Sequence, residues 1–271
     1  MRFSVVAVPL GGGRRWVDSV RAWDEQGWDA VLVPDTMGTA STFPALAAAA
    51  AVTTRLHLRT WVLAAPLRTP VATVREVKAL QLLSDGRFEL GIGTGRPDAA
   101  REAAMLGVDW PTAPGRIAQL ERVVAAVRNE VSPTPPVVVT ASGPKMIQAA
   151  ARMLTDSDSG DADRLGLALA PSADAAELEE LTGRIRAAVP RVRMAFQLVG
   201  VGDRLSGWIA RQGAWTATGL AARGAVAMLP NSVEAAADAL GEWPQRYGID
   251  EVIVPAEFTE AALPVLRRLR A

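Results

Sequence analysis

Three glycines and an arginine follow an apolar segment in the stretch FELGIGTGRPD, residues 88–98. Glycines after a strand often bind the phosphates of a dinucleotide, but that signature requires the spacing G-x-G-x-x-G at a strand-to-helix turn. Here Gly91, Gly93 and Gly95 give G-x-G-x-G, and Arg96 follows directly. The stretch therefore does not predict a dinucleotide site. Its glycines would instead allow a flat ligand to approach the backbone closely, or would accommodate strand curvature.

A second stretch, TASGPKM at residues 140–146, could bind a phosphate. Backbone N–H groups at a helix N-terminus are the donors that an oxyanion accepts, and the Ser142 hydroxyl and the Lys145 ammonium would lie nearby. Glycine turns before helices are common, so the pattern alone is also compatible with an ordinary turn. The candidate phosphate-binding residues are Thr140, Ala141, Ser142, Gly143 and Lys145.

The residue types exclude several other chemistries. The chain has no cysteine and one histidine, so a catalytic triad or a multi-histidine zinc site would depend on His57 alone. His57 alternates with leucines, and we expect it to be a solvated or hydrogen-bonded strand position. The only lysines, Lys78 and Lys145, do not follow strands where a Schiff-base lysine would be expected. No metal site is predicted.

Charge and composition point to a small-molecule ligand. The formal net charge is zero and the sequence pI is about 6.6, so no basic field is available to bind nucleic acid or an anionic membrane. No apolar run approaches the roughly 20 residues of a membrane span. The absence of cysteine favours an intracellular, cytoplasmic protein. The first residues are interpreted as a strand and not as a leader peptide.

Short apolar segments alternate with longer segments of helical period, a pattern typical of repeated βα units and a parallel sheet. The predicted strands are FSVVAV from Phe3, AVLVPD from Ala30, LHLRTWVL from Leu56, FELGIG from Phe88, PVVVTA from Pro136, RLGLAL from Arg164, RMAFQLVG from Arg193 and EVIVPA from Glu251. The predicted helices cover residues 14–26, 42–53, 70–83, 115–129, 144–154, 173–188, 232–246 and 259–270. Asn231 or Ser232 and Thr259 are predicted to cap the last two of these helices, and Pro70 fits a first turn after Thr69.

Eight βα units without a dinucleotide fingerprint favour a closed (β/α)8 TIM barrel with few insertions over two Rossmann halves. We expect one α/β domain over residues 1–271. Residues 200–223 are less regular and would form either a lid over the barrel mouth or an ordinary packed insertion.

Barrel enzymes bind their substrates at the carboxyl ends of the strands, so polar residues there are candidates. Asp35 and Thr36 follow the second strand, and Arg96 follows the fourth. Asp35 could accept a hydrogen bond in the pocket or cap the next helix. Arg96 could bind a substrate carboxylate or cofactor oxygens, or it could pair with Asp98 on the surface. Weaker candidates are Asp203 and Glu257.

The order of these motifs resembles that of the luciferase-like monooxygenase superfamily, the barrel family of flavin- or F420-dependent oxidoreductases. The resemblance rests on GWDAVLVPD from Gly27, TRLHLRTWVLAAPLRTPVATVREVKALQLLSDGRFELGIGTGRPD from Thr54, APGRIAQLERVVAAVR from Ala113 and PPVVVTASGPKMIQAAAR from Pro135. The segment from Thr54 is the most specific, because P-L-R-x-P, L-S-x-G-R and G-x-G-x-G follow one another at the family's spacing.

The resemblance implies a binding site for an isoalloxazine-like ring beside the fourth strand. A side chain on Gly93 or Gly95 would occupy the volume of that ring. The resemblance also implies a cis peptide between Trp61 and Val62, and a cofactor phosphate at the turn from Thr140 to Lys145 after the fifth strand. The implied cofactor-binding residues are Trp61, Val62, Gly93, Thr94, Gly95, Thr140, Ala141, Ser142, Gly143 and Lys145.

Two positions depart from the family pattern. Several F420-dependent members have a histidine after the strand-two aspartate and a glutamate after the strand-four glycines, whereas this chain has Thr36 and Arg96. The acid-base chemistry of the sugar-phosphate dehydrogenases in the family is therefore not expected. The resemblance leaves Asp35, Thr36 and Arg96 as candidate catalytic residues, with most of the chemistry supplied by the cofactor.

The resemblance favours an F420-dependent oxidoreductase that exchanges hydride with a small organic substrate, because VLAAPLRTP resembles the branch usually assigned to F420. Alternatives are an FMN-dependent monooxygenase that uses dioxygen, a cofactor-binding homologue without turnover, and a cofactor-free barrel such as an isomerase. Relatives commonly pair through helices two and three, so a homodimer is expected. Burial within the monomer would equally explain the apolar segment FPALAAAAAV.

Overall fold

Strands and helices alternate along the whole chain in the computed structural model, which describes residues 1–96, 98–141, 143–154 and 163–271. The barrel strands are β1 (Arg2–Val6), β2 (Ala30–Val33), β3 (His57–Thr60), β4 (Leu63–Ala64), β5 (Phe88–Gly93), β6 (Val137–Ala141), β7 (Arg164–Leu167), β8 (Arg193–Gln197) and β12 (Ile249–Pro255). The larger helices are α1 (Gly13–Gln26), α2 (Thr42–Ala50), α3 (Pro70–Leu83), α5 (Ala113–Glu130), α6 (Pro144–Met153), α7 (Ala175–Ala188), α10 (Val233–Gly241) and α12 (Thr259–Arg270).

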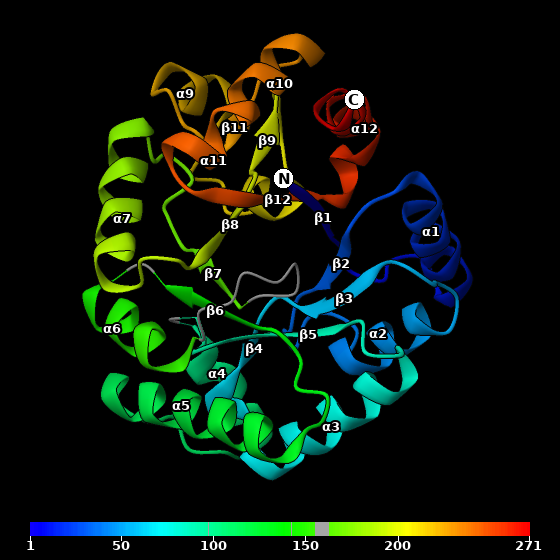
Figure 1. The fold of residues 1–271 in the computed structure, drawn as a ribbon, viewed down its shortest axis with the longest axis vertical. Coiled ribbons are helices and arrows are strands. Elements are labelled where there is room, and N and C mark those ends of the chain that lie inside the picture. The colour runs from blue at the N-terminus through cyan, green and yellow to red at the C-terminus, as the bar shows by residue number, and fades with distance from the viewer. Residues whose placement is uncertain (97, 142, 155–162) are drawn as a thin grey trace.

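The parallel strands close into a TIM barrel, as the sequence predicts. In the described residues they follow the order β3-β2-β1-β12-β8-β7-β6-β5-β4, and pairing of β3 with β5 closes the ring. Figure 1 looks along the barrel and shows the helices as a ring outside the strands. All the predicted strands and the eight predicted helical regions are present, with ends that differ by a few residues.

Several local predictions need correction. The predicted third strand is divided into β3 and β4 by a cis peptide between Trp61 and Val62. The predicted helix at 232–246 is two helices, α10 and α11 (Trp243–Arg246), and Ser232 caps the first through the Ala235 N–H. Thr259 is the first residue of α12 and does not cap it; its hydroxyl instead donates to the Ala256 carbonyl at 2.9 Å.

The sequence patterns did not predict two further features. One is α4 (Ala99–Leu106), a short helix after β5. The other is a small sheet of β9 (Gly200–Val201), β10 (Arg204–Leu205) and β11 (Met228–Leu229). Two short helices, α8 (Gly207–Ala210) and α9 (Ala217–Ala222), lie between β10 and β11 in the chain. The 3-10 turns η1 (Ala65–Leu67) and η2 (Ala256–Phe258) follow β4 and β12.

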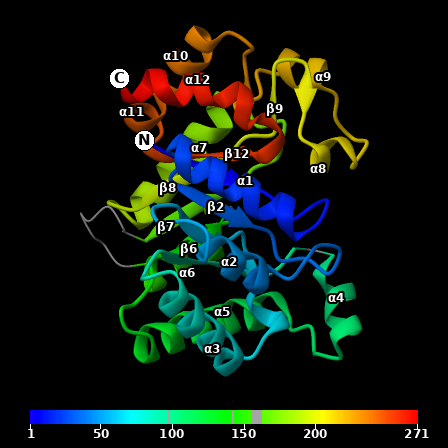
Figure 2. The same cartoon turned by 90° about the vertical axis from the view of Figure 1, so that its right-hand side faces the viewer.

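Residues 200–223 form a packed insertion at the carboxyl end of the barrel. Ile209 and Leu220 are fully buried, and the Gly207 N–H donates to Glu257 Oε1 at 2.7 Å. Figure 2 shows α4 and α8 on the same side of the barrel, whereas both termini lie on the opposite side. The insertion is therefore anchored to the barrel mouth, which supports the packed-insertion interpretation. No helix in the described part of the chain is long and apolar enough to cross a bilayer.

The interior of the barrel changes character along its axis. At the amino end, the side chains of Arg59, Glu89, Arg164 and Glu251 are fully buried. Further towards the carboxyl end, a small cluster of Ala30, Leu32, Ala195 and Ile253 fills the interior, and Trp61 packs against it. Because alternate residues of a strand face the same side, one strand can supply both layers.

Candidate active site

Glycines of β5 allow this strand to lie close to its neighbours in the barrel. A Cβ atom on Gly91 would lie 1.8 Å from the Thr60 carbonyl oxygen. A Cβ atom on Gly93 would lie 2.8 Å from Thr140 Oγ1 and 3.2 Å from Val62 Cγ2. These contacts bring Val62, Gly93 and Thr140 together at the carboxyl ends of adjacent strands. The glycines are therefore required by the packing of the protein itself, whether or not a ligand also approaches them.

The Trp61 indole closes the carboxyl end of the barrel interior. Its Nε1 donates to Gln197 Oε1 at 2.6 Å. A Cβ atom on Gly166 would lie 2.9 Å from the edge of the same ring, so the indole rests on the β7 backbone. Trp61 is half-buried, and the ring forms a floor between the apolar interior and the mouth.

Trp110 takes the space beside Gly95. Gly95 has a φ of +84°, in the region that favours glycine, and a Cβ there would lie 2.6 Å from Trp110 Cη2. The Arg116 guanidinium stacks at 4.9 Å from the centre of the Trp110 ring. The sequence motifs did not single out Trp110. Trp110 thus fills the space that a side chain on Gly95 would need, and the cofactor roles of Thr94 and Gly95 stay predictions.

The candidate phosphate-binding turn leads into α6. Gly143 precedes α6, which has no side-chain cap among the described residues, and a Cβ atom on Gly143 would meet nothing within 4 Å. Lys145 is exposed in the first turn of α6, while Ala141 is buried at the end of β6. Ser142 lies outside the described residues. The open, uncapped N-terminus of α6 therefore fits a cofactor phosphate.

Asp35 forms an ion pair and does not cap the next helix. Its Oδ1 lies 3.0 Å from Arg68 Nη2 and also accepts from the Thr42 hydroxyl at 3.4 Å. The Arg68 guanidinium also stacks at 5.3 Å from the centre of the Phe43 ring. Arg68 belongs to the P-L-R-x-P motif, so this pair connects two motifs of the resemblance. The Thr36 hydroxyl lies 3.2 Å from that of Thr39 in the adjoining turn.

Arg96 is held at the surface by two carboxylates. Its Nε lies 3.1 Å from Asp98 Oδ1, and its Nη2 lies 2.8 Å from Glu102 Oε1. Glu102 Oε1 also accepts from the Met37 N–H at 3.3 Å and so joins the loops after β2 and β5. The surface-bridge interpretation of Arg96 is confirmed. The sequence patterns missed Glu102 because they did not predict α4.

The remaining weak candidates do not join this group. Glu257 accepts the Gly207 N–H, and Asp203 is exposed in the turn between β9 and β10. Helix α2 buries most of its apolar side chains within the monomer. Burial within the monomer therefore accounts for the apolar character of the segment FPALAAAAAV, and no partner chain is needed to explain it. Helix α3 leaves Val71 and Leu82 exposed at 76% and 78%, so a homodimer stays a prediction.

Strongly shifted ionisation occurs at the other end of the barrel. Burial opposes the charge of Glu89, but the guanidinium groups of Arg2 and Arg59 and the adjacent His57 outweigh burial and hold the pKa of Glu89 well below its usual range. Burial also opposes the charge of Glu251, whose pKa is nevertheless lowered, mainly by Arg59 and Arg2. His57 is a half-buried strand position whose Nδ1 lies 3.1 Å from Glu89 Oε1 without hydrogen-bond geometry among the described residues.

Comparison with known proteins identifies one family. The model of the luciferase-like monooxygenase family matches residues 1–188. Comparison with curated protein sequences gives no significant match.

Among solved structures, the monooxygenase RslO1 from Streptomyces bottropensis is 19% identical, with 100% of both chains covered and a TM-score of 0.69. The coenzyme F420 dependent tetrahydromethanopterin reductase from Methanopyrus kandleri is 13% identical, with 98% of this chain and 96% of that chain covered and a TM-score of 0.69. The oxygenating constituent of 3,6-diketocamphane monooxygenase from Pseudomonas putida, in complex with FMN, is 12% identical, with 98% and 95% covered and a TM-score of 0.70. At these identities, the likeness shows the fold.

Proposed function

This chain belongs to the luciferase-like monooxygenase family, and from that membership we propose that it is an F420-dependent oxidoreductase. It would exchange hydride between the deazaflavin and a small organic substrate at the carboxyl end of the barrel. The proposal rests above all on the adjoining ends of β5 and β6. There Val62 and Thr140 flank Gly93, and the turn after β6 leads directly into the uncapped N-terminus of α6.

These two features fit the two ends of the cofactor. Trp61 and Val62 would support the flat ring, since the indole already closes the barrel interior beneath the mouth. The backbone N–H groups of the first turn of α6 and the Lys145 ammonium would hold the phosphate-bearing tail. When bound, the deazaflavin supplies the carbon that donates or accepts the hydride.

The candidate polar side chains are engaged with other protein groups. Asp35 pairs with Arg68, and Arg96 is held by Asp98 and Glu102. These residues would position the loops around the mouth and contribute charge to it. The hydride passes directly between the deazaflavin and a substrate carbon, and the accompanying proton would be exchanged with water. This scheme is compatible with Thr36 and Arg96 at the positions where relatives have a histidine and a glutamate.

FMN-dependent monooxygenation is the second candidate, because FMN also has a flat ring and a phosphate. The solved structures that resemble this chain include both an F420-dependent reductase and an FMN complex, at TM-scores of 0.69 and 0.70. The α6 turn would accept the phosphate of either cofactor.

Parallel equilibrium titrations of the purified protein with F420 and with FMN, followed by fluorescence, test the proposal. We expect saturable F420 binding that is tighter than FMN binding. Anaerobic mixing of the complex with candidate substrates would then be followed by the absorbance change of the deazaflavin. Selective FMN binding with oxygen consumption would favour the monooxygenase, and F420 binding without turnover of any substrate would favour a non-catalytic homologue. Binding of neither cofactor would contradict both enzyme assignments.

A further inference from the structure

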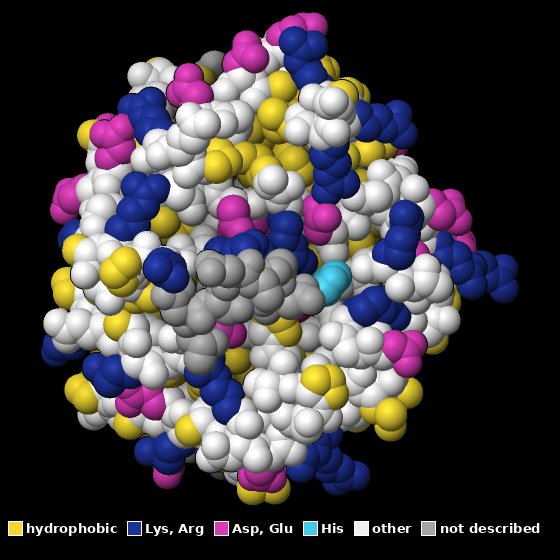
Figure 3. Space-filling view, viewed as in Figure 1, with side chains coloured by type: hydrophobic (Ala, Val, Ile, Leu, Met, Phe, Trp, Pro, Cys, Tyr) yellow, Lys and Arg dark blue, Asp and Glu magenta, His cyan; other side chains and the backbone are white. Residues whose placement is uncertain are grey.

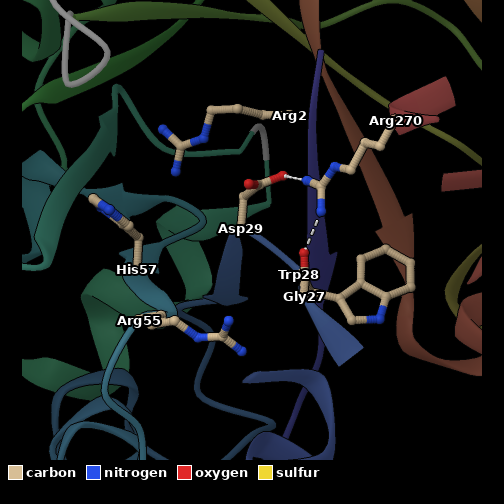
Figure 4. Close-up of a pocket in the computed structure, with 7 residues that line it drawn as sticks. All are labelled: Arg2, Gly27, Trp28, Asp29, Arg55, His57 and Arg270. Carbon is tan, nitrogen blue, oxygen red and sulfur yellow. Dashed lines mark hydrogen bonds and ion pairs between the residues drawn. The ribbon is translucent and has the colours of Figure 1, made fainter. Parts of the chain in front are cut away.

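A recess of ≈ 390 Å³ opens at the amino end of the barrel, opposite the candidate active site. Basic and acidic side chains gather near the centre of this face in Figure 3. The recess is formed between the starts of β2 and β3 and the C-terminal helix, and Figure 4 shows its side chains. We call it the amino-end recess and define it by Arg2, Trp28, Asp29, Arg55, His57 and Arg270.

Positive charge predominates in the amino-end recess. Arg2, Arg55 and Arg270 contribute three guanidinium groups and His57 an imidazole, whereas Asp29 is the only carboxylate among the lining residues that the structure describes. The Oδ2 atom of Asp29 already accepts a hydrogen bond from Arg270. In Figure 4, Arg2, His57 and Arg55 lie on one side of Asp29 and Arg270 on the other. The Asp29 carboxylate thus separates Arg270 from the other three basic groups, and an anion would bind on the side of Arg2, Arg55 and His57.

The carboxylates beneath the recess are already occupied by buried guanidinium groups. Glu89 lies 2.7 Å from Arg2 Nη2 and 2.5 Å from Arg59 Nη2. Glu251 lies 2.9 Å from the same Arg59 group and also accepts the Ser4 hydroxyl. In the described part of the chain, Arg2 Nη1 is buried without a hydrogen-bond acceptor. Among the described residues, Arg2 Nη1 is thus a donor beneath the recess that is open to an acceptor.

Arg55 is an accessible cation of the recess, as is Arg270. Its Nη2 donates to the Asp24 carbonyl, which holds the guanidinium in place. The Asp24 carboxylate is itself occupied by backbone N–H groups, including that of Leu56 at 2.7 Å. No carboxylate lies within 4.0 Å of the Arg55 guanidinium among the residues that the structure describes. Arg55 therefore presents a positioned guanidinium at the rim, attracted by the nearby Asp24 carboxylate without an ion pair to it.

We propose that the amino-end recess binds a small anion that carries a phosphate group. Guanidinium groups offer paired N–H donors that match the oxygens of a phosphate, and the volume lies in the range of roughly 300–1,000 Å³ that small-molecule sites have. The ligand is held by Arg2, Arg55 and His57. This site is separate from the cofactor site, because the two lie at opposite ends of the barrel.

The single histidine gives a site-specific test. His57 is the only histidine of the chain, so its imidazole proton resonances can be followed by NMR in the intact protein. At fixed pH and ionic strength we expect saturable shifts of these resonances with inorganic phosphate and with pyrophosphate, and tighter binding of pyrophosphate. Chloride at the same ionic strength is the control. Equal shifts with chloride, or no saturation, would overturn the proposal.

Matched variants locate the anion. We expect Arg55→Gln to weaken phosphate binding at least about 5-fold, whereas Arg223→Gln, which removes an exposed arginine at the end of α9, leaves the affinity unchanged. Lys145→Gln, at the cofactor end, is also expected to leave the His57 shifts unchanged. Because Arg55 and Arg223 are both exposed, neither change should impair folding. Equal affinities of the Arg55 and Arg223 variants would overturn the proposal, and citrate binding without phosphate binding would overturn the assignment of ligand class.

Discussion

The two ends of the barrel interior use opposite chemistry on the same strands. At the amino end, arginines and glutamates with no solvent exposure form a paired layer. At the carboxyl end, glycines and small apolar residues allow the strand backbones to approach one another closely. Trp61, Val62 and Thr140 line the mouth there. One strand can serve both ends, since Glu89 and Gly93 both belong to β5.

This contrast separates stability from ligand binding. Charges that have left water are tolerated only when partners replace the lost hydration, so the amino-end layer depends on every one of its members. The carboxyl end depends on volume, because a single methyl group changes which atoms fit there. Substitutions at the amino end should therefore lower stability by leaving buried charge unpaired, whereas substitutions at the carboxyl end should act by changing the space available to side chains and ligand.

The largest expected effect is that of Glu89→Gln. The change removes the fully buried carboxylate that pairs with Arg2 and Arg59 and leaves buried positive charge uncompensated. We expect the free energy of unfolding to fall by about 3–5 kcal/mol, measured by urea denaturation. Glu76→Gln, at an exposed position of α3, is the control and should change it by less than about 0.5 kcal/mol. Equal effects of the two changes would show that the charged layer is not a stability element.

Acidification should weaken the same layer. The pKa values of Glu89 and Glu251 are lower in the folded protein than their usual value of 4.5, so their stabilisation is complete above that pH and is lost as the pH falls below it. Asp250 acts in the opposite direction, because burial raises its pKa and its protonation then favours the folded state. With two groups against one, we expect stability to decline below about pH 4.5. Urea midpoints measured from pH 6 to pH 3 should fall in the wild type and fall less steeply in Glu89→Gln.

At the carboxyl end, Gly93→Ala should have a smaller cost than the loss of Glu89. The new Cβ would lie 2.8 Å from Thr140 Oγ1, so Thr140 or Val62 must move. We expect a loss of about 1–3 kcal/mol in the free energy of unfolding, together with weaker cofactor binding. Gly183→Ala, on the exposed face of α7 with nothing within 4 Å, should be neutral or stabilising. If Gly93→Ala were as harmless as Gly183→Ala, the close packing at this strand end would not matter for stability.

The smallest effect is expected for Asp35→Asn. The ion pair between Asp35 and Arg68 is partly exposed, with side-chain exposures of 13% and 28%. Such pairs contribute about 1 kcal/mol or less, so urea denaturation should detect little change. A loss comparable to that of Glu89→Gln would mean that the mouth also relies on paired charge and would remove the contrast between the two ends.

Periodicity predicted the barrel well, because each barrel strand and each larger helix is signalled by its own residues. The spacing from P-L-R-x-P to G-x-G-x-G also predicted the cis peptide between Trp61 and Val62 through resemblance. The partners of Asp35 and Arg96 were harder to predict, since Arg68 is 33 positions away from Asp35 and Glu102 lies on a short helix with a weak pattern.

The amino-end layer escaped prediction for a similar reason. Glu251 contacts Arg59 across 192 positions of sequence. Each residue stands between one apolar and one polar neighbour, so the local pattern does not show that either side chain faces the barrel interior. Only the closed structure shows which charges meet. Trp110 beside Gly95 likewise depends on the path of a loop.

The most direct test of the account is an F420 titration of the wild type beside Lys145→Gln and Lys78→Gln, the only two lysines of the chain. Lys145 lies in the first turn of α6, whereas Lys78 lies on α3 and pairs with Glu130 at 3.6 Å. We predict that Lys145→Gln weakens F420 binding about tenfold, or about 1.4 kcal/mol, and that Lys78→Gln leaves it unchanged. Equal affinities for all three proteins, or no F420 binding by the wild type, would contradict the assignment of the carboxyl end as the cofactor site.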